Sequence, residues 1–91
     1  MNERPTYKFH EVERMLKSKL QCKVKQKRRH IQYGVYNEEQ LLGITYMSRN
    51  KQDVGSKLEK DMSNQLGISK EIFGALVSCE AGKQDYIDLV T

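Results

Sequence analysis

The stretch from Lys23 to Arg49 constrains the fold more than any other part of the chain, because two of its segments alternate in polarity. The segment HIQYGVY, residues 30–36, places apolar side chains at every second position, which is the period of a strand with one buried face. A polar corner at 37–40 separates it from a second apolar run at 41–48. The pattern therefore predicts a β-hairpin with these two arms and with Ile31, Tyr33 and Val35 toward the core.

A run of basic residues leads directly into this hairpin. Its lysines alternate with Cys22 and Val24, so a first strand over 20–25 would turn them to the face opposite the core. A tight charged connection over 26–29 then leads to His30. We therefore expect one sheet with an apolar side and a basic side that can bind a polyanion. The residues expected to contact it are Lys23, Lys25, Lys27, Arg28, Arg29 and Tyr36.

The uneven distribution of charge supports an anionic partner. Net charge is +4, but residues 1–49 hold eleven Lys/Arg against five Asp/Glu, whereas residues 50–91 hold five against seven. Such clustering favours nucleic acid first and a membrane surface second. A solvated lysine-rich surface without a ligand remains the alternative.

Apolar spacing predicts helices on both sides of these strands. One amphipathic helix is expected over 6–19, a second after an Asp53 N-cap and up to Gly67, and a third over 70–79 with Ser69 as its N-cap. The segment QDYIDLV, residues 84–90, fits a strand, a helical turn or a docking segment equally well, and 1–5 are expected to be a short tail. The order predicts an α+β fold of two layers, α-β-β-β-α(-α): a three-stranded antiparallel meander with helices on one face. We expect a single domain, 1–91, with a core over about 6–79 and a C-terminal extension over 80–91.

Composition narrows the class of protein. Apolar residues make up 37% and charged residues 31%, and no apolar run approaches the roughly 20 residues of a membrane-spanning helix. No signal peptide is expected, so the predicted location is the cytoplasm. The two cysteines, Cys22 and Cys79, are expected to be buried reduced thiols. No metal-ligand spacing or glycine-rich phosphate loop occurs, so we expect neither metal nor cofactor.

Taken together, these segments resemble the HicA family of bacterial and archaeal toxins. The likeness covers roughly residues 8–77: FHEVERMLKSKL and QCKVKQKRRH are similar to the family's opening helix and first strand, and DVGSKLEKDMSNQLGISKEIFGAL to its closing helices. Arg28-Arg29 stand where the family has Gly-Ser, and Ile44-Thr45-Tyr46 replace a valine-proline pair and a histidine. The resemblance implies the fold of double-stranded-RNA-binding domains, cleavage of mRNA, and inhibition by a HicB-like antitoxin. It also implies that His30, at the family's histidine position, is catalytic.

The residues around His30 leave several functions open. A metal-independent ribonuclease needs a base for the ribose 2′-hydroxyl and cations for the phosphate, which His30 and its basic neighbours can supply. The same histidine can equally be a phosphate-contacting or structural residue. By alternation Tyr33 and Tyr46 are expected in the core and Tyr36 on the basic face, where it can stack on bases. The remaining alternative is a non-catalytic interaction protein that forms a homodimer or pairs a sheet edge with a partner.

Overall fold

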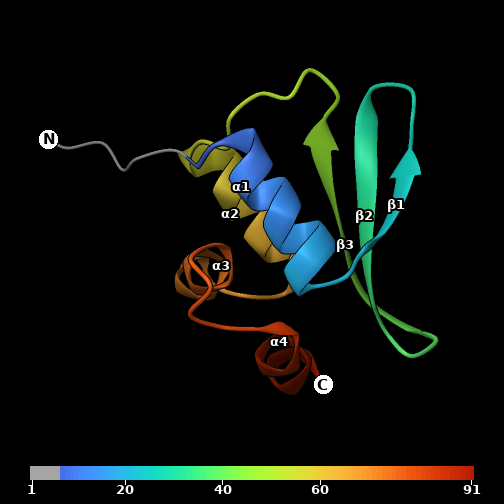
Figure 1. Ribbon diagram of the computed structural model, residues 1–91, viewed down its shortest axis with the longest axis vertical. Coiled ribbons are helices and arrows are strands. Elements are labelled where there is room, and N and C mark those ends of the chain that lie inside the picture. Colours follow the sequence, from blue (N-terminus) through green and yellow to red (C-terminus); the bar gives the residue numbers. More distant parts are fainter. Residues whose placement is uncertain (1–6) are drawn as a thin grey trace, which may run out of the picture.

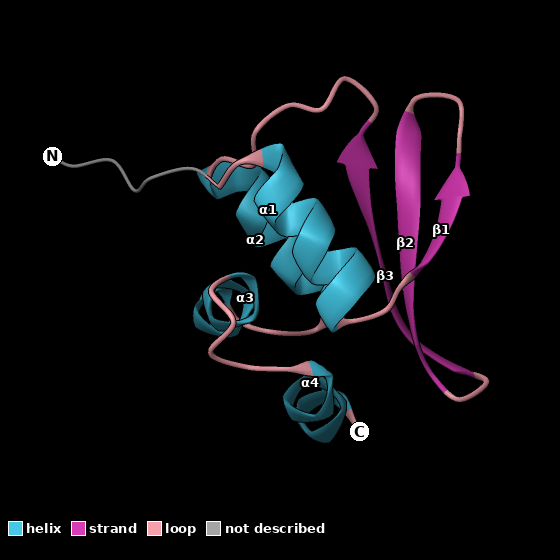
Figure 2. Ribbon diagram, in the orientation of Figure 1, coloured by secondary structure: helices cyan, strands magenta, loops and turns pink. Residues whose placement is uncertain are grey.

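A computed structural model describes residues 7–91, in which an N-terminal helix is followed by three strands and three further helices (Figure 1). The elements are α1 (Phe9–Arg14), the π-helical turn η1 (Met15–Lys19), β1 (Lys23–Gln26), β2 (His30–Asn37), β3 (Gln40–Ser48), α2 (Ser56–Leu66), α3 (Lys70–Val77) and α4 (Lys83–Val90). The strands form one antiparallel sheet in the order β1-β2-β3, and the helices pack to one side of it (Figure 2). This confirms the α+β class and the meander. The segment left open by the sequence forms α4, and the expected tail 1–5 lies outside the described residues. The first helix was expected from residue 6, but it begins at Phe9, because Tyr7 forms an isolated β-bridge with Val54 and Lys8 is the extended N-cap of α1.

The hairpin of β2 and β3 has the predicted arms, extended by one residue at each side of the turn. Asn37 pairs with Gln40, so the turn consists of Glu38 and Glu39, and Glu38 adopts a positive φ of 59°. The register shifts by one residue between Val35 and Tyr36, which is a β-bulge. This extra residue in β3 determines which of its side chains reach the core.

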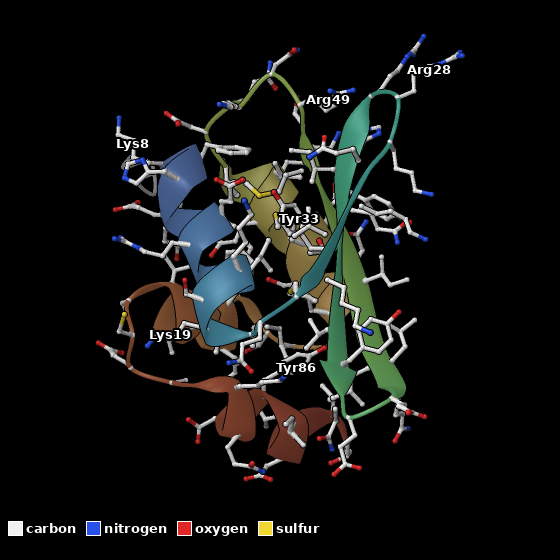
Figure 3. The ribbon with its side chains drawn as sticks, turned by 45° about the vertical axis from the view of Figure 1, so that its right-hand side comes forward. Lys8, Lys19, Arg28, Tyr33, Arg49 and Tyr86 are labelled. Atoms are coloured by element: carbon white, nitrogen blue, oxygen red, sulfur yellow. The ribbon has the colours of Figure 1, made fainter. Side chains whose placement is uncertain are left out.

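The core lies between the sheet and the helices and contains two fully buried tyrosines (Figure 3). The hydroxyl of Tyr33 donates to Glu13 Oε2 at 3.3 Å, and burial, with the Glu13 carboxylate second, raises the pKa of this phenol. Tyr86 of α4 donates to the carbonyl of Leu66 at 2.8 Å, and burial raises its pKa to about 12. Because Tyr86 is part of the core cluster, α4 packs on the rest of the molecule. The predicted inward-facing residues Ile31, Tyr33 and Val35 are all buried, as expected.

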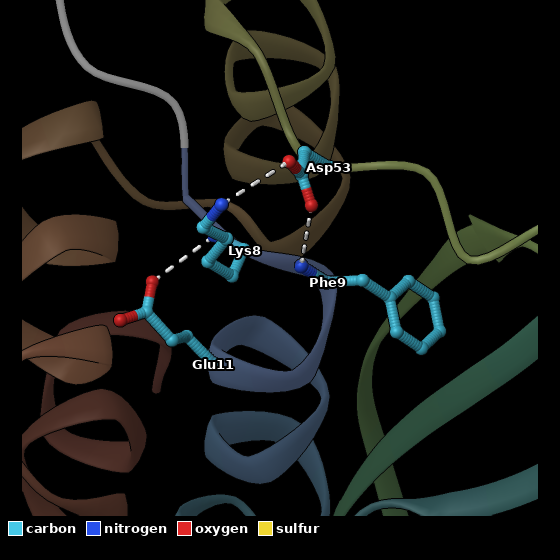
Figure 4. A network of polar contacts seen from close by, with 4 residues as sticks. All are labelled: Lys8, Phe9, Glu11 and Asp53. Carbon is cyan, nitrogen blue, oxygen red and sulfur yellow. Dashed lines mark hydrogen bonds and ion pairs between the residues drawn. The ribbon is translucent and has the colours of Figure 1, made fainter.

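Asp53 has a different role from the one the sequence predicts. It is not the N-cap of α2, which begins after Gly55. Its Oδ1 accepts from the backbone N–H of Phe9 at 3.2 Å and its Oδ2 lies 4.0 Å from Lys8 Nζ, while Glu11 accepts from the backbone N–H of Lys8 (Figure 4). Asp53 thus satisfies the start of α1 from 44 residues away. The prediction was wrong because a cap from a distant segment leaves no local pattern.

The end of α2 and the start of α3 lie where the capping residues in the sequence predict them. Gly67 ends α2 with φ 78°, and the N–H of Ile68 returns to the carbonyl of Ser63 at 2.9 Å, as in a Schellman cap. Ser69 Oγ accepts from the N–H of Ile72 at 3.2 Å at the start of α3. The first strand begins later than expected, at Lys23, because Leu20 ends η1 as a fully buried residue.

Candidate nucleic-acid interface

Cross-strand pairing defines the face of the sheet that the helices leave uncovered. Partners in an antiparallel pair lie on the same face, and Lys23 pairs with Gly34 while Lys25 pairs with Gln32. The N–H of Lys27 donates to the carbonyl of His30 at 2.8 Å, which continues this pairing to the turn. Along β2 these positions alternate with Ile31, Tyr33 and Val35, so they face away from the core; Gly34 is also buried, with the Tyr36 ring beside it. We call this surface the outer face; its residues are Lys23, Lys25, Lys27, His30, Gln32, Gly34, Tyr36, Leu41, Ile44, Tyr46 and Ser48.

One tyrosine of the outer face is covered by a lysine. The ring of Tyr36 lies close to Gly34, where an added Cβ would stand 3.2 Å from Tyr36 Cε1. Lys23 Nζ lies 4.5 Å from the centroid of the same ring, at the distance of a cation–π contact. Tyr36 is therefore on the face that the sequence predicts, but a base can stack on it from the Lys23 side only by displacing this lysine.

Tyr46 also lies on the outer face, so the expectation that it belongs to the core was wrong. It pairs with Gln32, and its side chain is 37% exposed. The bulge turns Thr45 and Met47 inward instead, and both are buried. The buried hydroxyl of Thr45 has a hydrogen-bond partner, because it donates to Gln65 Oε1 at 2.7 Å, and this allows a polar residue in the core. Apolar character alone therefore gave the wrong phase for this part of β3.

A cluster of cations forms at one end of the sheet, around the turn between β1 and β2. Arg28 and Arg29 make up this turn, and Arg49, which the sequence analysis did not select, donates from Nη1 to the carbonyls of Lys27 and Arg28 at 3.2 and 3.5 Å. Figure 3 shows Arg28 and Arg49 at the same end of the molecule. We call Lys27, Arg28, Arg29 and Arg49 the basic end. The signal for Arg49 was present in the hairpin register, because it follows the residue that pairs with His30.

The cations of this surface lack carboxylate partners. Within residues 7–91, the ion pairs up to 4.0 Å join Lys8 to Asp53 and Lys17 to Glu13, and neither involves the outer face or the basic end. All five of the predicted cations, at positions 23, 25, 27, 28 and 29, are exposed. Their positive potential is therefore directed to solvent, where an anionic ligand can neutralise it.

His30 lies where the outer face meets the basic end. It is exposed, and its ring stands edge-on to Tyr46, with centroids 6.2 Å apart and planes at 73°. Both rings line a surface pocket of about 480 Å³ between β3 and α2. His10, the other histidine of the chain, is an exposed residue of α1 and thus belongs to the helical layer. The structure brings His30 together with cations and an aromatic ring, but not with a second histidine.

The two cysteines differ from each other. Cys22 is half-buried, and burial raises the pKa of its thiol to about 12, against a smaller lowering by Lys83. Cys79 is exposed just after α3 and has a positive φ of 70°, so the expectation that it is buried was wrong. In the part of the chain that the structure describes, no group of three or more His, Cys, Asp or Glu side chains is placed to hold a metal ion. No helix between residues 7 and 91 has the length and apolarity needed to cross a membrane.

Comparisons with protein-family models, with curated proteins and with solved structures found no match for this chain. The likeness to HicA toxins therefore remains a prediction from the quoted segments.

Proposed function

We propose that this protein binds RNA through the outer face and the basic end. The observation that carries the proposal is a row of exposed cations that, within residues 7–91, have no carboxylate partner and lie on the side of the sheet that no described helix covers. Phosphate contacts supply most of the affinity in such interfaces and need no preformed cavity. The element order, together with the sequence likeness, supports a double-stranded-RNA-binding-domain-like fold of the HicA type.

Charge at the two ends of the sheet supports a defined orientation of the ligand. The turn between β1 and β2 carries Arg28 and Arg29, whereas the turn between β2 and β3 carries Glu38 and Glu39. Because the strands run antiparallel, these two turns lie at opposite ends of β2. A polyanion would be attracted to the first end and repelled from the second, so it would approach the outer face from the basic end.

Nucleic acid fits this surface better than a membrane does. A membrane surface binds polybasic segments that are accompanied by inserted apolar side chains. The basic end instead adjoins the exposed rings of His30 and Tyr46, which suit stacking on unpaired bases. We therefore favour RNA that presents single-stranded bases, with the lysines on its phosphates.

The test is fluorescence anisotropy with labelled RNA over a range of salt concentrations. If about five phosphates are contacted, the slope of log K against log salt is about −3.5 for a single strand and about −4.5 for a duplex. Arg28→Ala/Arg29→Ala should weaken binding and flatten this slope by roughly 1 to 2. Lys57→Ala/Lys60→Ala, which removes two exposed charges from α2, is the matched control and should change binding much less. A flat salt response, or equal losses in both double variants, would exclude the outer face as the binding surface.

A second candidate, a HicA-like metal-independent ribonuclease, is favoured by the place of His30. This histidine is exposed beside a pocket and next to the basic end, where it can take a proton from a ribose 2′-hydroxyl while the arginines hold the phosphate. Cleavage of RNA in EDTA that disappears in His30→Ala would support this activity and a HicB-like antitoxin as partner. RNA binding without cleavage by either protein would leave a binding module alone. Equal cleavage by both would mean that His30 is not the catalytic group.

The alternative of a dimer or a partner strand at a sheet edge is less favoured. All four residues of the edge strand β1 are exposed, so its backbone edge is accessible. Two of the four are lysines, which oppose pairing with an identical strand through like-charge repulsion. A protein that sediments as a dimer at micromolar concentration would reopen this alternative.

A further inference from the structure

The pocket beside the basic end has the size and walls of a site for a flat ring. Its volume is about 480 Å³, within the range of small-ligand sites. Met47, which is almost fully buried, and the half-buried Leu58 supply its apolar side. The rings of His30 and Tyr46 form an aromatic wall on the side of the outer face. A planar heteroaromatic group can lie against this wall without burying an unsatisfied charge.

Two polar side chains of α2 supply hydrogen-bonding groups at the same pocket. Asp61 and Gln65 are four residues apart on α2, so they lie on one face of the helix with Cβ atoms roughly 5–6 Å apart. Thr45 Oγ1 donates to Gln65 Oε1 at 2.7 Å, which orients the amide and leaves its Nε2 group as the donor for a ligand. The ionised Asp61 carboxylate can only accept hydrogen bonds.

This donor and acceptor set matches guanine better than adenine or uracil. Guanine presents two adjacent donors, N1–H and the N2 amino group, which a single carboxylate can accept together, and beside them the O6 acceptor, which suits the Gln65 amide. Adenine presents the N1 lone pair at the central position, which would face the carboxylate oxygens and be repelled. Uracil offers only one donor between two carbonyl oxygens. The pocket is therefore complementary to the Watson–Crick edge of guanine.

The surroundings of the pocket suit a nucleotide within a chain. Ser48 lines the pocket, and the next residue, Arg49, reaches the backbone of the β1–β2 turn. Phosphates on either side of a bound base would thus lie close to the basic end. We propose that this pocket binds an unstacked guanine of single-stranded RNA, with the base against Tyr46 and its Watson–Crick edge at Asp61 and Gln65; this rests on the RNA binding proposed above.

The test compares labelled RNA pentamers that differ only at the central base: UUGUU, UUAUU and UUUUU. A bidentate contact of this kind discriminates by about 10-fold, so UUGUU should bind about 10 times more tightly than UUAUU. In Asp61→Asn the G-to-A ratio should fall to about 1, even if removal of a negative charge strengthens binding of all three pentamers. Asp88→Asn is the matched control: Asp88 is an exposed residue of α4 that also faces a glutamine four residues away, and the ratio should stay unchanged. Circular dichroism melts would show that both variants are folded.

The outcomes separate this inference from the function it rests on. A guanine preference that disappears in Asp61→Asn alone supports the pocket. Equal binding of the three pentamers by the wild type, or a preference that survives in Asp61→Asn, would overturn the pocket while leaving RNA binding in place. Failure of every pentamer and of longer RNA to bind would overturn the proposed function and the pocket together.

Discussion

The two faces of the sheet are built from alternate residues of the same strands, yet they differ in almost every physical property. On the covered face Ile31, Tyr33 and Val35 are buried against helices, whereas on the outer face Lys25 and His30 remain exposed between them. A one-residue change of register would exchange the two faces. If the outer face binds RNA as proposed, neighbouring positions along β2 contribute either to stability or to binding, so substitutions can change one without the other.

The difference in burial between the two faces of the sheet is smallest at β1. Val24 pairs with the fully buried Tyr33, but its own side chain is 40% exposed. β1 is an edge strand whose four residues are all exposed, so it adds little to the core. Its contribution is to carry two lysines, Lys23 and Lys25, on the outer face beside β2.

The largest expected effect comes from neighbouring substitutions on the two faces of β2. Ile31→Ala should lower the free energy of unfolding by about 2–5 kcal/mol, because it leaves a cavity against the helices. Gln32→Ala, one residue further on the outer face, should change it by about 0.5 kcal/mol or less. Urea denaturation of both variants measures the difference. Similar losses would mean that the outer face is also a stabilising surface.

Two glycines provide a second comparison. An added Cβ at Gly43 would stand 2.6 Å from the Tyr86 hydroxyl and 3.4 Å from Leu66 Cα, so Gly43→Ala should disturb the buried Tyr86–Leu66 hydrogen bond and cost about 1–3 kcal/mol. At Gly34, on the outer face, the nearest atom is Cε1 of the Tyr36 ring at 3.2 Å, which can move by a few tenths of an ångström. Gly34→Ala should therefore destabilise the protein less than Gly43→Ala does, as measured by thermal melts. A loss of stability in Gly34→Ala equal to or larger than that in Gly43→Ala would contradict the packing described for α4.

The two cysteines differ in burial, and the pH dependence of protein stability tests this difference. The Cys22 thiol ionises near its ordinary pKa of 9.0 in the unfolded chain but has a pKa of about 12 in the folded protein. Above pH 9 the unfolded state therefore releases its proton first, and stability should fall as pH rises, by about 2–3 kcal/mol at pH 11. Cys22→Ala should remove this part of the alkaline loss, whereas Cys79→Ala, at an exposed position, should not. Denaturation curves at pH 8 and pH 11 measure the free energy of unfolding of each variant. If it changed with pH by the same amount in both variants, the burial of Cys22 would be refuted.

The smallest expected effect lies at the acidic turn. Glu38 has a φ of 59°, a conformation that glycine adopts without strain, so Glu38→Gly should stabilise the protein by up to about 1 kcal/mol. Glu39, in the same turn, is not among the residues with positive φ, and Glu39→Gly should be neutral or slightly destabilising. Thermal melts of the pair would sharpen the comparison of the two sheet ends. Equal shifts would indicate that charge, not backbone strain, governs this turn.

Local patterns predicted what local interactions determine. The hairpin arms, the left-handed end of α2 at Gly67 and the Ser69 cap all depend on residues within a few positions, and all are present. The misplaced features depend on a distant contact in one case and on an irregular strand pairing in the other. Asp53 caps α1 across the fold, and Tyr46 faces outward because a bulge shifts the register of β3.

The same reasoning applies to the candidate site. Charge and alternation placed the lysines and His30, since a strand has only two faces. Arg49 could have been selected from the hairpin register, because it follows the residue that pairs with His30. Neither pattern could reveal that α2 brings Asp61 and Gln65 beside His30, because this depends on how the helix packs on the sheet. The C-terminal α4 was ambiguous for a related reason: its buried anchor, Tyr86, is recognisable only from its contact with Leu66.

The central claim is that the outer face is the binding surface, and an NMR titration of ¹⁵N-labelled protein with single-stranded RNA tests it most directly. The account predicts that amide shifts change along β1, at the basic end and at residues 30–36 and 44–49, while α1, α3 and α4 change little. Shifts concentrated on the helices, with β1 and the Arg28–Arg29 turn unaffected, would contradict it.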